Sequence, residues 1–205
     1  MSMLPIWTAA SESFGKTVTI GIIMLQEISC RIIIVDDMPD FAESMSDVLC
    51  TAGFEDIIIY TDPVKALAEL RNNTRPAIVI TDFNMPSMTG LELLKEIDQH
   101  HPEINGVIIT GRLDEALEDS HKYLVLDKAD RWTKKLVGHV LQIMKSHLLA
   151  LLVECPQGKK PKTCPLQGKR QLSQAELSQW LDELKPKEIQ AVIRAHEACC
   201  ASTPM

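Results

Sequence analysis

The sequence lacks the features that mark several protein classes. Its 205 residues include only six cysteines, which do not make a disulfide scaffold in a chain of this size, so we expect a reducing, cytoplasmic setting. Positive charge is in deficit, and the formal net charge of -7 argues against a surface that coats nucleic acid. The apolar run at residues 18–25 is too short to span a bilayer, and no small-residue cleavage site of a signal peptide follows it. We therefore expect no membrane association.

Four short apolar segments, each followed by polar residues, predict strands of one sheet. Residues 77–81 show no polar alternation, which is typical of a parallel strand that is covered on both faces. Ligands of open α/β sheets bind at the carboxyl ends of the strands, where these polar residues should gather. The segments and the residues after them are 30–35 with Asp36 and Asp37, 77–81 with Asp82, 106–109 with Thr110, and 123–126 with Asp127 and Lys128.

Helical patterns alternate with these strands. Apolar residues recur at helical spacing over 41–49, 63–70 and 91–97, and residues 57–60 form a further strand. The pattern predicts an α/β fold, a doubly wound five-stranded parallel sheet with helices on both faces. A fourth helix, within residues 112–123, is strongly charged and should be short or loosely packed.

The acids at the predicted sheet edge favour a metal site. The carboxylates of Asp36, Asp37 and Asp82 at one edge repel one another, and a hard divalent cation with oxygen ligands is the usual remedy. Magnesium is the natural candidate.

The ordered set of polar residues resembles the receiver domain of bacterial response regulators. The residues that carry the resemblance are Asp36 and Asp37, the stretch Asp82-Phe83-Asn84-Met85-Pro86 with Gly90, and Thr110 and Lys128. The resemblance covers roughly residues 30–145 and implies a flavodoxin-like fold. It also implies a phosphoacceptor protein rather than an enzyme, which receives its phosphoryl group from a histidine kinase or a phosphotransfer protein.

The resemblance also implies a role for each site residue. Asp82 is the expected phosphoacceptor, and Thr110 and Lys128 are expected to contact the phosphoryl group. A carboxylate nucleophile of this kind forms an acyl phosphate, and the lysine neutralises charge on the transferred group. The expected ligands of Mg²⁺ are Asp36, Asp37, Asp82 and the backbone carbonyl of Asn84.

Two positions depart from the family pattern. Val125 stands three residues before Lys128, where an aromatic switch residue is common, and Ala129 replaces a common proline. A scaffold with a receiver fold that acts without phosphorylation is therefore an alternative. A transcription regulator whose C-terminal helices contact DNA is a second alternative.

The chain divides into an N-terminal extension at 1–28, a receiver domain at 29–146, and a helical C-terminal module at 147–205. Residues 131–153 predict an unusually long helix that runs across the second boundary. Its apolar seam follows the spacing of a coiled coil and must be covered, either by C-terminal helices of the same chain or by a homodimer. The seam consists of Val137, Leu141, Met144, Leu148 and Leu151.

The sequence of the C-terminal module predicts two helices and also suggests a zinc site as one hypothesis. Ser173 and Glu176 form a capping box, and Pro186 opens a second helix. No helix with base-reading residues is visible, so we expect output through protein contacts and no binding of nucleic acid. The cysteine spacing matches no standard ligand pair, which leaves a redox thiol pair or simple packing as alternatives to zinc. The zinc candidates are Cys155, Cys164, His196 and Cys199 or Cys200.

Overall fold

Five parallel strands form the centre of the computed structural model, which describes residues 30–72, 76–113, 116, 120, 122–153 and 164–201. The predicted N-terminal extension and Cys155 lie outside these residues. The strand order is β2-β1-β3-β4-β5, which confirms the predicted doubly wound sheet. The strands are β1 (Ile32–Val35), β2 (Ile57–Tyr60), β3 (Ile78–Asp82), β4 (Asn105–Thr110) and β5 (Leu124–Asp127).

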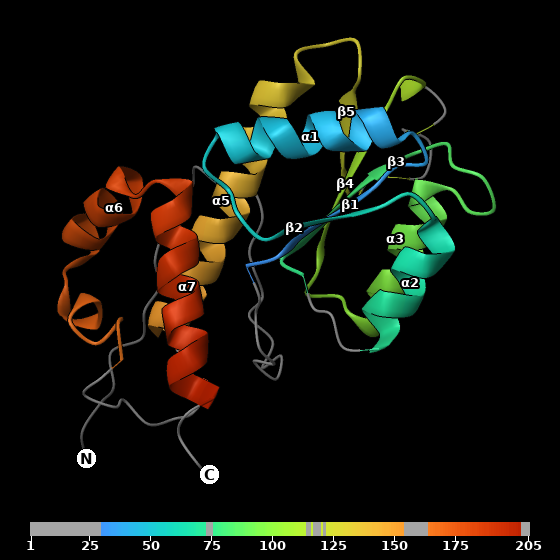
Figure 1. Ribbon diagram of the computed structural model, residues 1–205. Coiled ribbons are helices and arrows are strands. Elements are labelled where there is room, and N and C mark those ends of the chain that lie inside the picture. The colour runs from blue at the N-terminus through green and yellow to red at the C-terminus, as the bar shows by residue number, and fades with distance from the viewer. Residues whose placement is uncertain are drawn as a thin grey trace.

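Helices cover both faces of the sheet (Figure 1). On one face lie α1 (Pro39–Thr51) and α5 (Trp132–Val153), and on the other lie α2 (Pro63–Asn72) and α3 (Gly90–His100). Successive residues of a strand point to opposite faces. Ile32 and Ile34 of β1 accordingly pack under α1 and α5, whereas Ile33 packs under α2 and α3. The continuous apolar runs in the sequence are thus explained by burial on two sides.

Several helix boundaries match their sequence signals. The Asp62 side chain accepts hydrogen bonds from the backbone N–H groups of Val64 and Lys65, which caps α2. Helix α1 ends before Gly53, which adopts a φ of 95°. In the stretch of the predicted fourth helix, residues 114, 115, 117–119 and 121 lie outside the described residues.

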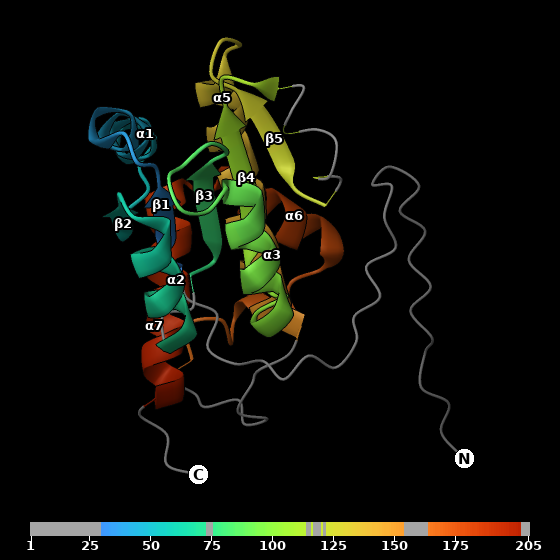
Figure 2. The ribbon, with the colours of Figure 1, turned by 90° about the vertical axis from the view of Figure 1, so that its right-hand side faces the viewer.

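Two further helices lie beside α5 (Figure 1), and in Figure 2 they lie behind the sheet when it is seen from the side of α2 and α3. They are α6 (Gln174–Glu183) and α7 (Pro186–Ala201), preceded by the 3₁₀ turn η1 (Lys169–Gln171). The capping box of Ser173 and Glu176 and the start of α7 at Pro186 confirm the sequence prediction. Helix α7 packs along α5, where Leu166, Ile189 and Ile193 are fully buried.

Burial along α5 differs from the predicted coiled-coil seam. Met144, Leu148 and Leu151 are buried as predicted, but Val137 and Leu141 are only partly buried. The buried stripe of α5 also includes four residues that the prediction did not name: Leu136, Val140, Ile143 and Leu152. The reason is that α5 packs on the sheet and α1 and along α7, so its buried face follows a helical period of 3.6 residues rather than a two-helix seam.

Helices of the same chain cover Leu148, whereas a homodimer stays a prediction. By length and composition alone, α5 could also cross a membrane, and no other helix in the described part of the chain could. A core helix passes the same test, and the central stripe of α5 is buried against the sheet and α7.

Arg170 fixes the end of α5. Its guanidinium donates to the backbone oxygens of Leu151 (2.8 Å) and Leu152 (3.2 Å), and it also contacts the sulfur of Cys164 at 3.3 Å. The last carbonyls of a helix have no partner within the helix and carry partial negative charge. Arg170 therefore ties the segment before α6 to the end of α5.

A buried glutamine docks α7 on the amino edge of the sheet, where the strands begin. Gln190 is fully buried; its Oε1 accepts from the N–H of Glu55 at 2.7 Å, and its Nε2 donates to the carbonyls of Glu55 (2.8 Å) and Cys30 (3.1 Å). The Glu55 carboxylate pairs with Lys187 (2.9 Å) and Arg194 (2.8 Å), and these cations lower the pKa of Glu55. Helix α7 therefore pairs with the backbone and side chain of Glu55 and with the carbonyl of Cys30 at this edge.

Candidate functional site

Two aspartates meet at the carboxyl edge of the sheet because their strands are adjacent and in register. Val35 of β1 pairs with Thr81 of β3, so Asp36 and Asp82 follow at the same level. Asp36 is fully buried and Asp82 is 7% exposed. Two buried carboxylates at the ends of adjacent strands repel each other, and their burial is costly without a compensating cation.

Lys128 supplies that cation. Its Nζ lies 2.7 Å from Oδ1 of Asp82 and 3.2 Å from Oδ2 of Asp36. The backbone N–H of Lys128 donates to the carbonyl of Thr110 at 2.8 Å, which places the residue just beyond the β4–β5 pair. The sequence prediction that Asp36, Asp82 and Lys128 share one edge is thus reproduced in the structure.

The remaining carboxylate oxygens accept backbone hydrogen bonds. Oδ1 of Asp36 accepts from the N–H of Met38 (2.9 Å), and Oδ2 of Asp82 accepts from the N–H of Asn84 (2.7 Å). Burial nevertheless raises the pKa of Asp36, although the Met38 N–H and Lys128 both act to lower it. The negative charge on Asp36 is therefore only partly compensated, a condition that favours binding of a further cation.

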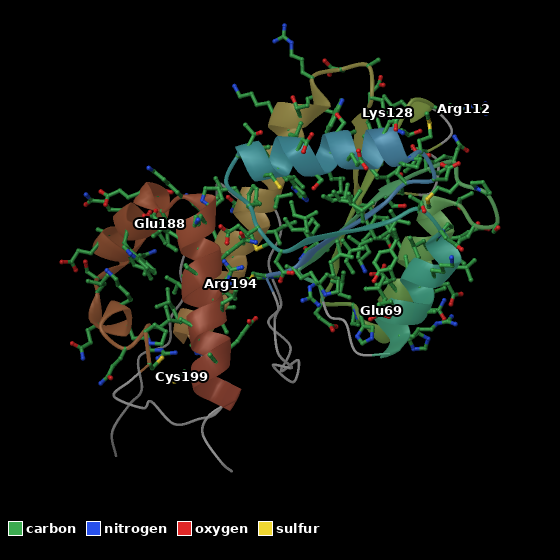
Figure 3. All side chains as sticks on the ribbon, viewed as in Figure 1. Glu69, Arg112, Lys128, Glu188, Arg194 and Cys199 are labelled. Carbon is green, nitrogen blue, oxygen red and sulfur yellow. The ribbon has the colours of Figure 1, made fainter. Side chains whose placement is uncertain are left out.

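Thr110 lies at the end of β4 and is fully buried. Its Oγ1 accepts a hydrogen bond from the N–H of Arg112 at 2.9 Å, and a threonine hydroxyl can in addition donate one hydrogen bond. Figure 3 shows Lys128 and Arg112 at the same end of the view, away from Arg194 and Cys199 on α7. The predicted phosphoryl-contacting residues thus belong to the carboxyl edge and not to the C-terminal module.

The loop between β3 and α3 requires glycine at its end. The N–H of Gly90 donates to the carbonyl of Phe83 at 2.9 Å, and a Cβ at position 90 would lie 2.0 Å from the carbonyl oxygen of Asp82. No side chain fits there unless the backbone of Asp82 moves. Gly90 therefore belongs to the site because it allows the chain to return close under Asp82.

The donor set at this edge fits a hard cation in kind. Asp37 follows Asp36 and is half-buried, and Asn84 is exposed on the loop after β3, so further oxygen donors follow both strand ends. In the described part of the chain, however, no three acidic, thiol or imidazole groups form a ready metal cluster. Lys128 holds the position between Asp36 and Asp82 instead. The oxygen donors of Asp36, Asp37 and Asp82 are the feature that supports magnesium.

The structure gives the zinc hypothesis no support. Cys164 and His196 are buried and Cys199 is half-buried, but these residues form no metal cluster within the described ranges. Arg170 contacts the sulfur of Cys164, and burial together with Arg170 lowers the pKa of His196. A guanidinium beside both candidate ligands disfavours a second cation.

Two aromatic residues of the site were missed as functional candidates. The ring of Phe41 in α1 lies under Lys128, with Nζ 3.9 Å from the ring centroid. The ring of Trp132, the first residue of α5, lies 5.4 Å from that of Phe41. In the sequence, Phe41 is only one member of an apolar helical pattern, and no local signal pairs it with Lys128.

The position of the usual aromatic switch holds a half-buried aliphatic residue, Val125. The nearest aromatic, Tyr123, points elsewhere: its hydroxyl donates to the carboxylate of Asp98 in α3. Lys122 also pairs with Asp98 at 2.7 Å. Tyr123 is therefore held at the start of β5, away from Thr110.

Comparison with known proteins agrees with the geometry. The family model of the response regulator receiver domain matches residues 32–142, more than half of the chain. A response regulator receiver protein of Anaeromyxobacter sp. (strain Fw109-5) is 37% identical over 93 residues, which are 45% of this chain and 38% of that protein. Chemotaxis protein CheY1 of Helicobacter pylori is 33% identical over 82 residues, 39% of this chain and 66% of that protein.

Solved structures show the same fold. The receiver domain of a response regulator from Clostridium thermocellum aligns with a TM-score of 0.52 at 23% identity, over 59% of this chain and 98% of that one. In sequence, this chain covers 38% of the Anaeromyxobacter protein and 66% of CheY1, less than two thirds of the length of either relative. The chain belongs to the response regulator receiver domain family of two-component systems.

Proposed function

We propose that the protein is a phosphoacceptor response regulator, phosphorylated on Asp82 by a histidine kinase or a phosphotransfer protein. The observation that carries the proposal is the placement of Lys128 Nζ within 2.7 Å of Asp82 and 3.2 Å of Asp36. A carboxylate beside a fixed cation is suited to accept a phosphoryl group, because the cation offsets the charge that builds on the phosphoryl oxygens.

The chemistry of the proposed step is a phosphoryl exchange. A carboxylate oxygen of Asp82 forms a bond to phosphorus while the bond from phosphorus to the donor imidazole nitrogen breaks, and the electron pair stays on that nitrogen. Lys128 stays beside the new acyl phosphate, and the Thr110 hydroxyl, which accepts from the N–H of Arg112, would donate to a phosphoryl oxygen. In this proposal Asp82 itself receives the phosphoryl group, so the protein serves as a phosphoacceptor rather than as an enzyme.

Magnesium is the proposed cofactor. Asp36, Asp37, Asp82 and the backbone carbonyl of Asn84 would hold it, and the ion would add positive charge beside the phosphoryl oxygens. The partly compensated charge of Asp36 supports this assignment. We also propose that the protein acts in the cytoplasm.

Output through protein contacts fits the position of the C-terminal helices. Helix α7 shares a core cluster with α1, α5 and the sheet, so the C-terminal helices pack directly on the receiver core. The net charge of -7 gives DNA binding no support, and retention on DNA that weakens with salt would favour the transcription-regulator alternative. A homodimer through residues 131–153 remains a proposal, and Leu149 and Val153 are exposed on that helix.

A specific observation favours one second candidate, a scaffold that acts without phosphorylation. Val125 stands at the switch position, and Tyr123 is held by Asp98 at the far end of β5. Such a protein would keep the site but would have lost the usual aromatic switch.

Phosphorylation of Asp82 distinguishes the two functions. The purified protein is incubated with Mg²⁺ and acetyl phosphate, and the intact mass is followed over time. We expect the addition of one phosphoryl group to the wild type and none to Asp82→Asn, whose amide oxygen can still accept the Asn84 N–H. Urea unfolding of the variant checks that its fold is intact. Equal labelling of the variant would exclude Asp82, and an unlabelled wild type would favour the scaffold.

A further inference from the structure

The geometry points to Phe41 as a positioning residue that holds Lys128 against Asp36 and Asp82 through the face of its ring. This role rests on the proposed phosphorylation of Asp82 and adds an aromatic support to that site. None of the family motifs in the sequence includes Phe41.

The contact is short and well placed. Nζ of Lys128 lies 3.9 Å from the centroid of the Phe41 ring, well within the distance of about 6 Å at which a ring face attracts a cation. The Lys128 side chain is only 22% exposed, so water screens this attraction less than at the surface. The ammonium of Lys128 is thus in contact with two carboxylates, which follow β1 and β3, and with the ring of Phe41 in α1. These three contacts leave Lys128 little freedom to move.

The ring is itself held by two helices. Phe41 lies in the first turn of α1, where its N–H donates to the carbonyl of Met38 at 3.1 Å. The Phe41 ring also packs against the ring of Trp132 in α5. The two ring centroids are 5.4 Å apart and the ring planes are tilted by 45°, a favourable arrangement for two aromatics. Trp132 follows Lys128 by four residues, so the support comes from the same chain segment that carries the lysine.

The consequence for phosphoryl transfer concerns preorganisation. Without the ring, the long Lys128 side chain would sample more conformations, and its Nζ would be beside Asp82 for less of the time. A cation that is already in place stabilises the developing charge without the cost of reordering. Phe41 therefore acts on the reaction only through Lys128.

The first experiment compares phosphorylation rates with acetyl phosphate and Mg²⁺. Phe41→Leu keeps an apolar side chain but removes the ring, and we expect a rate about tenfold lower, within the range that a cation–π contact spans. Phe41→Tyr keeps the ring and should restore the rate to within about twofold. The matched control is Leu141→Ala in α5, a half-buried residue of the same core cluster, which should leave the rate within about twofold of wild type.

The second experiment tests the contact without any phosphorylation. The urea midpoint is measured for wild type, Phe41→Leu, Lys128→Met and the double variant. The loss from Phe41→Leu should be smaller by about 0.5 M urea when Lys128 is already replaced. Additive midpoints would overturn the proposal, as would a wild-type rate for Phe41→Leu or a failure of Phe41→Tyr to restore the rate. If the wild type takes no phosphoryl group, the proposed function fails, and the urea measurements still decide whether Phe41 holds Lys128.

Discussion

The two edges of the sheet are built in opposite ways. At the amino edge, Gln190 of α7 pairs with three backbone groups, and two cations pair with Glu55. At the carboxyl edge, two buried carboxylates depend on a single lysine, and the pKa of Asp36 remains raised. Figure 3 places the labelled Lys128 and Arg194 in these separate regions.

The difference separates stability from reactivity within one sheet. At the amino edge, hydrogen bonds from Gln190 join α7 to the receiver core. They stabilise the fold, since a buried polar group without a partner would destabilise it. Incomplete compensation at the carboxyl edge costs stability but leaves charge that can bind a cation or a phosphoryl group. Substitutions at the two edges should therefore have different consequences for stability.

The largest effect is expected where α7 covers α5. Leu148 is fully buried, so Leu148→Glu loses apolar burial and places a carboxyl group in the core, at a cost of about 4–5 kcal/mol of unfolding free energy. Leu149→Glu is the matched control, since Leu149 is 41% exposed and its replacement should change stability by less than about 0.5 kcal/mol. Urea unfolding measures both. A dissociated but folded Leu149→Glu variant would instead support the proposed homodimer, and an unaffected Leu148→Glu variant would contradict the packing.

A glycine at the carboxyl edge gives the next largest effect. Gly90→Ala would force its Cβ against the carbonyl oxygen of Asp82 and should destabilise the protein by about 3 kcal/mol, with slower phosphorylation. The contrasting variant is Gly138→Ala in α5, where the new Cβ meets no atom within 4 Å. That change should stabilise the helix by about 0.5–1 kcal/mol. Thermal unfolding of both proteins checks the opposite signs.

The amino edge is tested by Gln190→Leu. The apolar side chain leaves the N–H and carbonyl of Glu55 and the carbonyl of Cys30 without their partner, and we expect a loss of about 2–3 kcal/mol. Gln179→Leu on the exposed side of α6 serves as the control and should have little effect. The acetyl phosphate reaction of folded Gln190→Leu should keep the wild-type rate, because this edge is remote from Asp82. A slowed reaction would show that the two edges are coupled.

The smallest effect should come from Asp36→Asn, and it depends on pH. Because burial raises the pKa of Asp36 above its ordinary value of 3.8, the folded protein binds this proton more tightly than the unfolded chain does. Stability from this residue is then greatest at low pH and is lost as the pH rises through the raised pKa. Asp36→Asn should therefore stabilise the protein near neutral pH more than at about pH 4, as measured by urea unfolding. A variant that is less stable at both pH values would show that pairing with Lys128 outweighs the burial of Asp36.

The sequence by itself determined the strands and helix starts, because these are set by residues that lie close together along the chain. Apolar runs that end in Asp82 and Thr110 indicated buried parallel strands, and the capping box at Ser173 and the proline at 186 marked helix starts that the structure confirms. These signals are local, because hydrophobic periodicity and capping act over only a few residues. The order of the motifs then sufficed to indicate the receiver family.

Only the tertiary structure decided which residues meet across the chain. Gln190 bonds to Glu55, 135 residues away, and the ring of Phe41 lies under Lys128 although neither position marks the other in the sequence. The buried face of α5 also differs from the predicted seam, since it includes Leu136 and Val140. This face is determined by packing on the sheet and α7. Such contacts depend on how whole elements pack, and a local pattern records that a residue is apolar or polar but not which distant group it will contact.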